Sequence, residues 1–225
     1  MKTNKKKYYV FQIDLNTINI GSFILFIPIL IISYILYPTS FIEVLENYTF
    51  LEFFTWYFIY IILHEILHSI SYVINGAKFN KVTYGIVLEK SILCCLCKQN
   101  ITKKNILHSL MYPLVFIGII TYIIALIFKL PLLFILSIFN IVGCIGDIIM
   151  FFFIKKLDND IEFSEYDDPI GFGIYTNKDI SKEKHFGLNF IETKNTLKRE
   201  EFKKVVISKT SIIIIILFIL IGLIS

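Results

Sequence analysis

The chain has 225 residues, of which 56% are hydrophobic, and it carries a formal net charge of +4. Soluble globular proteins are usually about 45–50% apolar and lack long apolar runs. Several runs in this chain approach the roughly 20 residues that span a bilayer. The sequence therefore excludes an ordinary soluble domain and predicts an integral membrane protein. The lysines at its N-terminus read as a topology signal, and nothing else in the sequence favours nucleic-acid binding.

Five apolar runs predict five transmembrane helices in an all-α polytopic fold. They cover residues 20–37, 50–74, 107–128, 130–154 and 205–225. The first run is too long for a signal peptide, and no A-x-A-like cleavage site follows it. Residues 1–154 are therefore expected to form a membrane domain. Residues 155–204 are expected to form a small cytoplasmic segment before the last helix.

Lysines are distributed unevenly between these runs. They gather before the first run, in the loop 78–105 and after the fourth run, whereas the first connection carries Glu43 and Glu46 and no lysine or arginine. Under the positive-inside rule, the basic segments lie in the cytoplasm. We expect a multi-pass protein of a bacterial cytoplasmic membrane, with its N-terminus in the cytoplasm and its C-terminus outside.

Two polar segments are long enough to fold. In the loop 78–105, KVTYGIVLE and SILCCLCKQ are β-prone and predict a short hairpin-like element. In the segment 155–204, GFGIY and HFGLNFIE predict strands and TLKREEFKK predicts a helix, which together make a small α+β segment. This segment is too short to bury much core alone, and either a gating role or a solvated tail fits it. No disulfide and only a weak metal motif are expected from the loop's Cys94, Cys95 and Cys97.

HEILH, at residues 64–68, lies inside the second apolar run. Four positions separate His64 from His68, so a helix presents both imidazoles on one face, one turn apart. That spacing lets two neutral nitrogens bind one zinc ion at about 2.0–2.1 Å. Glu65 is then placed to act as general base. Because ionisable groups are costly in hydrocarbon, a zinc site explains these residues better than polar contacts between helices.

A catalytic zinc site needs a third protein ligand and one open position. Asp147 is the expected third ligand, because it is the carboxylate of the fourth run. It precedes Lys155 by eight residues, and His68 precedes Asn75 by seven. A helical rise of about 1.5 Å per residue puts both at a similar depth near the cytoplasmic face. Glu89, in the loop after the motif, is the alternative ligand.

The stretches HEILHSISYVINGAKFNKVTYG, CLCKQNITKKNILHSLMYPL and NIVGCIGDI resemble the "putative zincin peptidase" family of small bacterial membrane proteins. More distantly, the arrangement resembles site-2-protease metalloproteases, which cleave substrates within or beside the bilayer. The resemblance covers about residues 50–156. It implies zinc binding by both motif histidines, base catalysis by the motif glutamate and a third ligand at Asp147. Unlike the site-2 pattern, Ile148 rather than glycine follows the aspartate.

These features predict a zinc metallopeptidase embedded in the membrane, with Zn²⁺ as cofactor and a peptide or membrane protein as substrate. The lipid bilayer is its expected surrounding, and the substrate and the oligomeric state are open. The alternative is a non-catalytic membrane scaffold or a small-solute permease that uses the histidines and the aspartate structurally. Side chains expected near the metal ligands are Asn140 and His108, whereas Cys144 is expected to pack, His185 to lie at the surface and Pro113 to loosen its helix.

Overall fold

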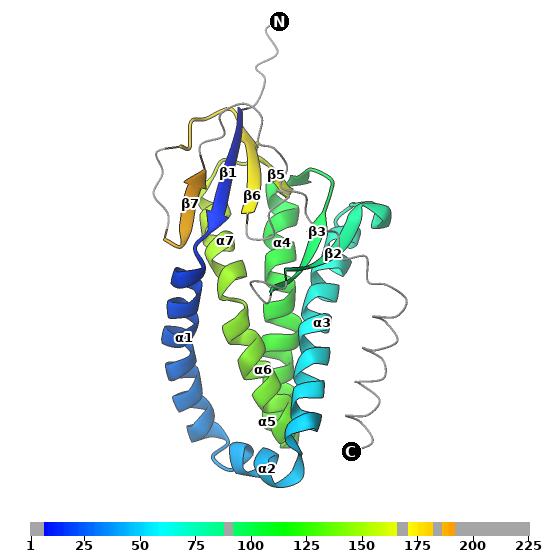
Figure 1. The fold of residues 1–225 in the computed structure, drawn as a ribbon, viewed down its shortest axis with the longest axis vertical. Coiled ribbons are helices and arrows are strands. Elements are labelled where there is room, and N and C mark those ends of the chain that lie inside the picture. Colours follow the sequence, from blue (N-terminus) through cyan, green and yellow to red (C-terminus); the bar gives the residue numbers. More distant parts are fainter. Residues whose placement is uncertain (1–6, 88–91, 166–170, 182–185, 192–225) are drawn as a thin grey trace, which may run out of the picture. The chain divides into compact units, whose positions relative to one another are not determined.

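The computed structural model describes residues 7–87, 92–165, 171–181 and 186–191 (Figure 1). The described residues fall into two compact units. The first unit contains residues 7–21 and 65–112 and the described part of 145–191, and the second contains residues 22–64 and 113–144. Several sequence predictions lie outside the described residues, namely the helix 205–225, the helix TLKREEFKK, Glu89 and His185.

The first unit contains a five-stranded antiparallel sheet with strand order β4-β5-β6-β1-β7 (Figure 1). The register of β1 sets Tyr9 opposite Ile174 and Phe11 opposite Phe172 of β6, and Phe11 opposite Phe190 of β7. The N-terminal strand therefore lies between two strands from the far end of the chain. The strands are β1 (Lys7–Ile13), β4 (Ile101–Thr102), β5 (Glu162–Glu165), β6 (Gly171–Thr176) and β7 (Leu188–Ile191).

The described residues are mostly helical, as predicted, but the sheet is larger than the predicted α+β segment because it includes the N-terminus. The strands expected in GFGIY and HFGLNFIE are confirmed as β6 and β7. Strands β1, β4 and β5 were not predicted: the N-terminal residues look like a topology signal, Ile101–Thr102 is only two residues long, and DNDIEFSEYDDP looks like an acidic stretch. The sequence KYYVFQI of β1 is rich in the aromatic and β-branched residues that favour strands. The segment after residue 155 thus completes a sheet with the N-terminus.

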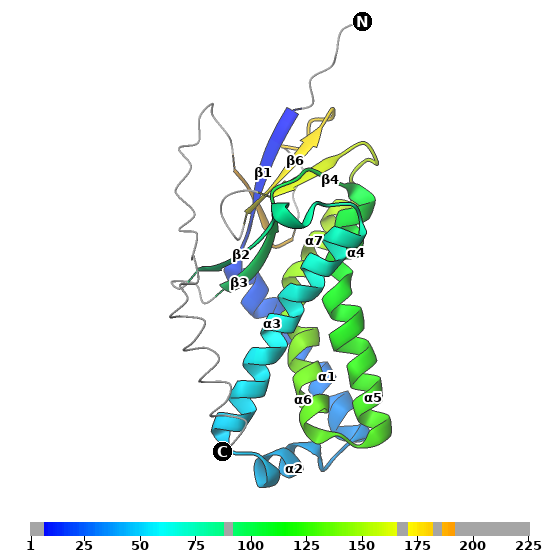
Figure 2. The ribbon, with the colours of Figure 1, turned by 90° about the vertical axis from the view of Figure 1, so that its right-hand side faces the viewer.

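Helices α4 (Lys103–Pro113) and α7 (Ile145–Lys156) share a hydrophobic core with this sheet. Figure 2 shows α7 and α4 below β4 and β6. The ring of Phe11 lies 4.8 Å from that of Phe153 on α7, and both belong to the core with Ile106 of α4. Burying aromatic side chains of this size stabilises the packing of helix on sheet. The core therefore fixes α7, the helix that carries Asp147.

The hairpin predicted in the loop 78–105 is confirmed. Strand β2 (Val82–Val87) pairs antiparallel with β3 (Ile92–Cys97) in a separate two-stranded sheet. A short 3₁₀ turn, η1 (Phe79–Lys81), leads into it. Cys95 and Cys97 of β3 are buried in the core of the first unit, which gives these small apolar side chains a packing role.

Helix α3 (Phe50–Ile74) has the bounds expected from its apolar run. At its start, the Thr49 amide donates to the Glu52 carboxylate and the Glu52 amide donates to the Thr49 hydroxyl, which is a capping box. At its end, Gly76 has a φ of +94° and donates to the Val73 carbonyl, while Ala77 donates to the Tyr72 carbonyl. This pattern is a Schellman motif, in which glycine tolerates the left-handed conformation. Both helix ends are therefore specified locally.

The second unit is helical. Helix α6 contacts α2, α5 and the π-helical segment η3, and Figure 2 shows α5 beside α6. Its core is aromatic: the Phe134 ring lies 4.7 Å from that of Tyr122 and 5.4 Å from that of Tyr37. The elements concerned are α1 (Leu15–Leu36, which begins in the first unit), α2 (Ser40–Asn47), η3 (Leu114–Ile120), α5 (Thr121–Phe128) and α6 (Pro131–Gly143).

Three described helices are long and apolar enough to cross a membrane: Leu15–Leu36, Phe50–Ile74 and Lys103–Phe128. The pair Pro131–Gly143 and Ile145–Lys156 qualifies as a fourth if it is counted as one broken span. The fourth predicted helix is therefore interrupted at Cys144, between Gly143 and Gly146, where low helix propensity favours a break. Apolar side chains such as Phe23 (66% exposed) and Ile35 (70%) face outward from α1, as lipid contact would require. These helices are consistent with a membrane protein.

Candidate metal centre

His64 and His68 lie one helical turn apart on α3, on the turn of the helix where the sequence predicted a metal site. His68 is 8% exposed, and Glu65 between them is equally buried. A continuous helix holds both imidazoles, so their spacing depends on α-helical geometry alone. The described structure thus confirms the same-face arrangement of the two rings.

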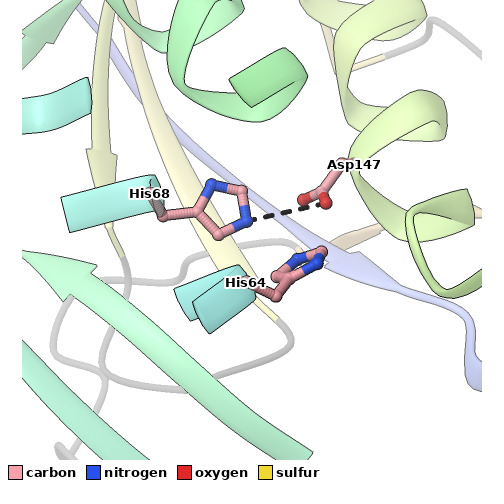
Figure 3. Close-up of side chains that lie close together, drawn as sticks. All are labelled: His64, His68 and Asp147. Atoms are coloured by element: carbon pink, nitrogen blue, oxygen red, sulfur yellow. Dashed lines mark ion pairs between the residues drawn. The ribbon is translucent and has the colours of Figure 1, made fainter. Parts of the chain in front are cut away.

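Asp147 lies in the first turn of α7, where the positive end of the helix dipole favours a carboxylate. Its Oδ2 is 3.6 Å from Nε2 of His68 (Figure 3). One ligand atom from each of His64, His68 and Asp147 lies within 4.8 Å of the others. The structure therefore brings together the three residues that the sequence predicted as metal ligands.

A hydrogen bond to the backbone orients the His68 ring. Its Nδ1 lies 3.0 Å from the carbonyl oxygen of Ser109 on α4, and a carbonyl oxygen can only accept. Nδ1 therefore carries a proton, and in the neutral ring Nε2, which faces Asp147, has the lone pair that a metal ligand needs. Metal-bound histidines usually donate their other N–H to an oxygen in this way.

A side-chain amide orients the His64 ring. Its Nδ1 lies 2.9 Å from Oδ1 of Asn140 on α6. Nδ2 of Asn140 donates to the carbonyl of Pro113 at 3.1 Å. Flipping the amide would lose this hydrogen bond and place its oxygen against the carbonyl oxygen. Oδ1 therefore faces the ring, and His64 must donate from Nδ1. His64 thus has the same tautomer as His68.

The donor set fits zinc. Two imidazole nitrogens and one carboxylate oxygen match the three protein ligands of a catalytic zinc site. Ligands at about 2.0–2.1 Å in tetrahedral geometry are separated by about 3.3–3.4 Å. The 3.6 Å between His68 and Asp147 is close to that spacing, and the ligand atoms of all three residues lie within 4.8 Å of one another. The tautomers of both histidines agree with the same assignment.

Tyr84 of β2 brings the hairpin to the motif helix. Its hydroxyl donates to the Ser69 hydroxyl at 2.6 Å, and Ser69 donates in turn to the carbonyl of Ile66. Burial raises the pKa of the Tyr84 phenol, the hydrogen bond with Ser69 lowers it in part, and the charges of Cys95 and Glu65 add smaller upward effects.

The other residues singled out from the sequence are placed as follows. Asn140 contacts a metal-ligand candidate as expected, whereas His108 is exposed on α4 and its contact with the site stays a prediction. Cys144 is fully buried, as a packing residue would be, and its Sγ is 4.0 Å from Nδ1 of His64. The alternative ligand Glu89 lies outside the described residues.

Sequence reasoning missed the two backbone carbonyls that hold the site. The carbonyl of Ser109 accepts from His68, and that of Pro113 accepts from Asn140. A backbone oxygen leaves no mark on the sequence, since every residue has one. The available signal is the spacing: a proline four residues after Ser109 in a helix cannot donate to the Ser109 carbonyl.

Residues 57–161 match the model of a family described as "Putative zincin peptidase". The matched segment includes α3 from Tyr57 onward, the hairpin, α4 to α7 and the three residues of the cluster. The resemblance to the zincin peptidase family is confirmed over this segment, and the more distant resemblance to site-2 proteases stays a prediction. Searches of curated proteins and of solved structures found no match.

Proposed function

We propose that the protein is a membrane-embedded zinc metallopeptidase that hydrolyses peptide bonds of membrane-associated substrates. One observation carries the proposal: His64, His68 and Asp147 lie within reach of a single ion, and both rings donate from Nδ1 to oxygen. The match of residues 57–161 to zincin peptidases supports the same chemistry.

Each residue of the cluster has a role that its chemistry supports. His64, His68 and Asp147 would hold the metal, and the carboxylate would offset part of its charge. Zinc, when bound, supplies a Lewis acid that polarises a carbonyl and lowers the pKa of water. Glu65 would accept the proton of the attacking water and then deliver it to the leaving nitrogen. Its burial, at 8% exposure, limits competition from bulk water around its carboxylate.

The proposed setting is the bacterial cytoplasmic membrane. The apolar helices α1, α3 and Lys103–Phe128 support membrane embedding. The lysines before α1 and after α7 support a cytoplasmic N-terminus under the positive-inside rule. Asp147 precedes Lys155 by about two helical turns, so the proposed site lies near the cytoplasmic ends of the helices. Substrates would therefore be peptides or membrane proteins with a cleavable bond near that face.

The Glu65→Gln variant tests this function. Purified wild type and variant are reconstituted in lipid vesicles and mixed with a library of fluorogenic apolar peptides. Both proteins should bind equal amounts of zinc, and only the wild type should cleave, because the amide cannot accept the proton. Glu46→Gln, on an exposed glutamate of α2, is the matched control and should cleave normally. Equal cleavage by wild type and Glu65→Gln would overturn the proposal, and zinc binding without cleavage by the wild type would favour a scaffold.

A further inference from the structure

We propose that Pro113 is a positioning residue for both histidines of the candidate metal centre. The inference rests on the proposed function, since it names how that same site is held. Pro113 is less than 2% exposed and ends α4, at the point where the helical run Lys103–Phe128 changes to the π-helical segment η3. Departures from α-helical winding of this kind occur frequently at functional sites.

The missing N–H of Pro113 provides an acceptor for His68. In an α-helix the amide of residue 113 would donate to the carbonyl of Ser109, four residues earlier, and proline has no amide hydrogen to donate. That carbonyl instead accepts from Nδ1 of His68 at 3.0 Å. The Ser109 hydroxyl donates back to the His68 carbonyl at 3.4 Å, and Ser109 is fully buried. The Ser109–His68 pair thus replaces the helical bond that proline removes.

The carbonyl of Pro113 provides the anchor for His64. It accepts from Nδ2 of Asn140 at 3.1 Å, and this bond turns the amide oxygen toward Nδ1 of His64 at 2.9 Å. Helix α6 packs closely against η3 at Gly118. A Cβ added to this glycine would lie 3.3 Å from Nδ2 of Asn140 and 3.0 Å from the Ile141 side chain. The π-helical segment and its glycine therefore leave room for Asn140 to reach the Pro113 carbonyl.

Pro113 thus acts on both histidines, through its missing N–H on His68 and through its carbonyl on His64. An alanine at position 113 would supply an N–H that competes with His68 for the Ser109 carbonyl. It would also relax the constraint on winding at the start of η3 and so disturb the carbonyl that holds Asn140. The expected consequence is a weaker preference of each imidazole for the Nδ1–H tautomer. A lower zinc affinity follows, because ligand orientation typically contributes about 10–100-fold to metal affinity.

The test compares Pro113→Ala with Pro28→Ala in the full-length protein in detergent. Pro28 also lies inside an apolar helix, α1, so its variant controls for loss of a helix proline in general. Two quantities are measured: zinc affinity by competition with a chelator, and the tautomers of ¹⁵N-labelled histidines in metal-free protein at about pH 8.5, above the usual histidine pKa. His64→Ala and His68→Gln variants assign the signals. Pro113→Ala should lower zinc affinity by about tenfold and reduce the Nδ1–H population, whereas Pro28→Ala should change neither.

The outcomes separate this inference from the proposed function. Unchanged tautomers and unchanged zinc affinity in a folded Pro113→Ala protein would overturn the role of Pro113. A wild type that binds no zinc would overturn the proposed function, and the tautomer measurement would still decide the role of Pro113. If Pro113→Ala does not fold, Pro113→Gly supplies the same N–H without an added methyl group and is measured in its place.

Discussion

Nε2 of His68 and Oδ2 of Asp147 lie 3.6 Å apart, although 79 positions separate the two residues in the sequence. A direct hydrogen bond would bring the atoms to about 2.7–2.9 Å, whereas two ligands of one tetrahedral zinc would lie about 3.3–3.4 Å apart. The observed separation is closer to the second value. The distance therefore fits two ligands of one ion better than a direct hydrogen bond.

Zinc should bind with a stoichiometry of one ion per chain, and His64→Ala should nearly abolish binding. Losing one of three protein ligands leaves too few donors to hold the ion against water. Metal analysis of purified wild type and variant measures this directly. His108→Ala, which removes an exposed histidine of α4, should keep full occupancy. Full zinc content in His64→Ala would exclude the motif histidines as the site.

Asp147→Ala should lose zinc, and Asp147→Asn should bind it more weakly, because an amide oxygen carries no charge to offset that of the ion. Glu89→Ala, at the alternative ligand proposed from the sequence, should keep the metal. Zinc affinity measured by chelator competition on all three variants distinguishes the two ligands. If Glu89→Ala lost zinc and Asp147→Ala retained it, the third ligand would belong to the hairpin loop.

Asn140→Ala should lower zinc affinity by about 10–100-fold while leaving the fold intact, because it removes the acceptor that orients His64. The matched control is Ser137→Ala, one turn earlier on α6. Ser137 is also buried, but its hydroxyl donates to the Phe134 carbonyl of the same helix. Similar zinc affinities for the two variants would show that Asn140 does not orient the ligand.

The sheet should lose stability in acid through Asp179. Hydrogen bonds from Ser181, and a smaller effect from the Tyr9 hydroxyl of β1 at 3.3 Å, lower the pKa of the Asp179 carboxyl. A carboxyl with a lowered folded pKa stabilises the protein above its ordinary value of about 3.9, and that contribution disappears as the pH falls below it. Asp179→Asn should therefore destabilise the protein at neutral pH and show a smaller further loss in acid. Thermal unfolding at several pH values measures both, and identical acid dependence in wild type and variant would contradict the assignment.

Reporter fusions should place Lys156 on the cytoplasmic side and a fusion after Ser225 on the opposite side. The lysines after α7 favour retention in the cytoplasm, and the apolar run 205–225 is long enough to cross once more. Removing Lys155 and Lys156 should weaken the cytoplasmic reporter signal at this position. It should not reverse the orientation, because many more lysines follow in the sequence. Signals from one side only would remove the last crossing from the proposed topology.

Helix α3 and the proximity of Asp147 to the motif could be predicted because each depends on local or periodic features. Apolar length and an Asn-Gly pair define the helix, and helical rise gives the depth of a carboxylate. The structure then places Asp147 beside His68. The partners of the imidazoles are harder to predict, because Ser109 acts through its backbone carbonyl. That contact depends on how α4 lies against α3.

Strand β1 could not be predicted from its local sequence, for a different reason. Seven residues with four lysines nearby look like a membrane-topology signal, and their strand partners lie more than 150 positions later. Pairing over that distance is determined by the folded core around Phe11 and Phe153. The interruption at Cys144 was only partly predictable from the sequence. The two nearby glycines are visible there, but a helix break is one of several outcomes that glycines allow.

The pairing of β4 with β5 restricts how often the chain crosses the bilayer between them. Ile101 pairs with Phe163, so both strands must lie on the same side of the membrane. An even number of crossings must therefore separate them. If the helical run Lys103–Phe128, which is long and apolar enough to span a membrane, makes one crossing, then α6 and α7 together must make another. A re-entrant loop at Cys144 would return the chain to the wrong side and leave the sheet unpaired. In a membrane topology with that crossing, the pairing of β4 with β5 requires the bent pair to pass through the bilayer completely.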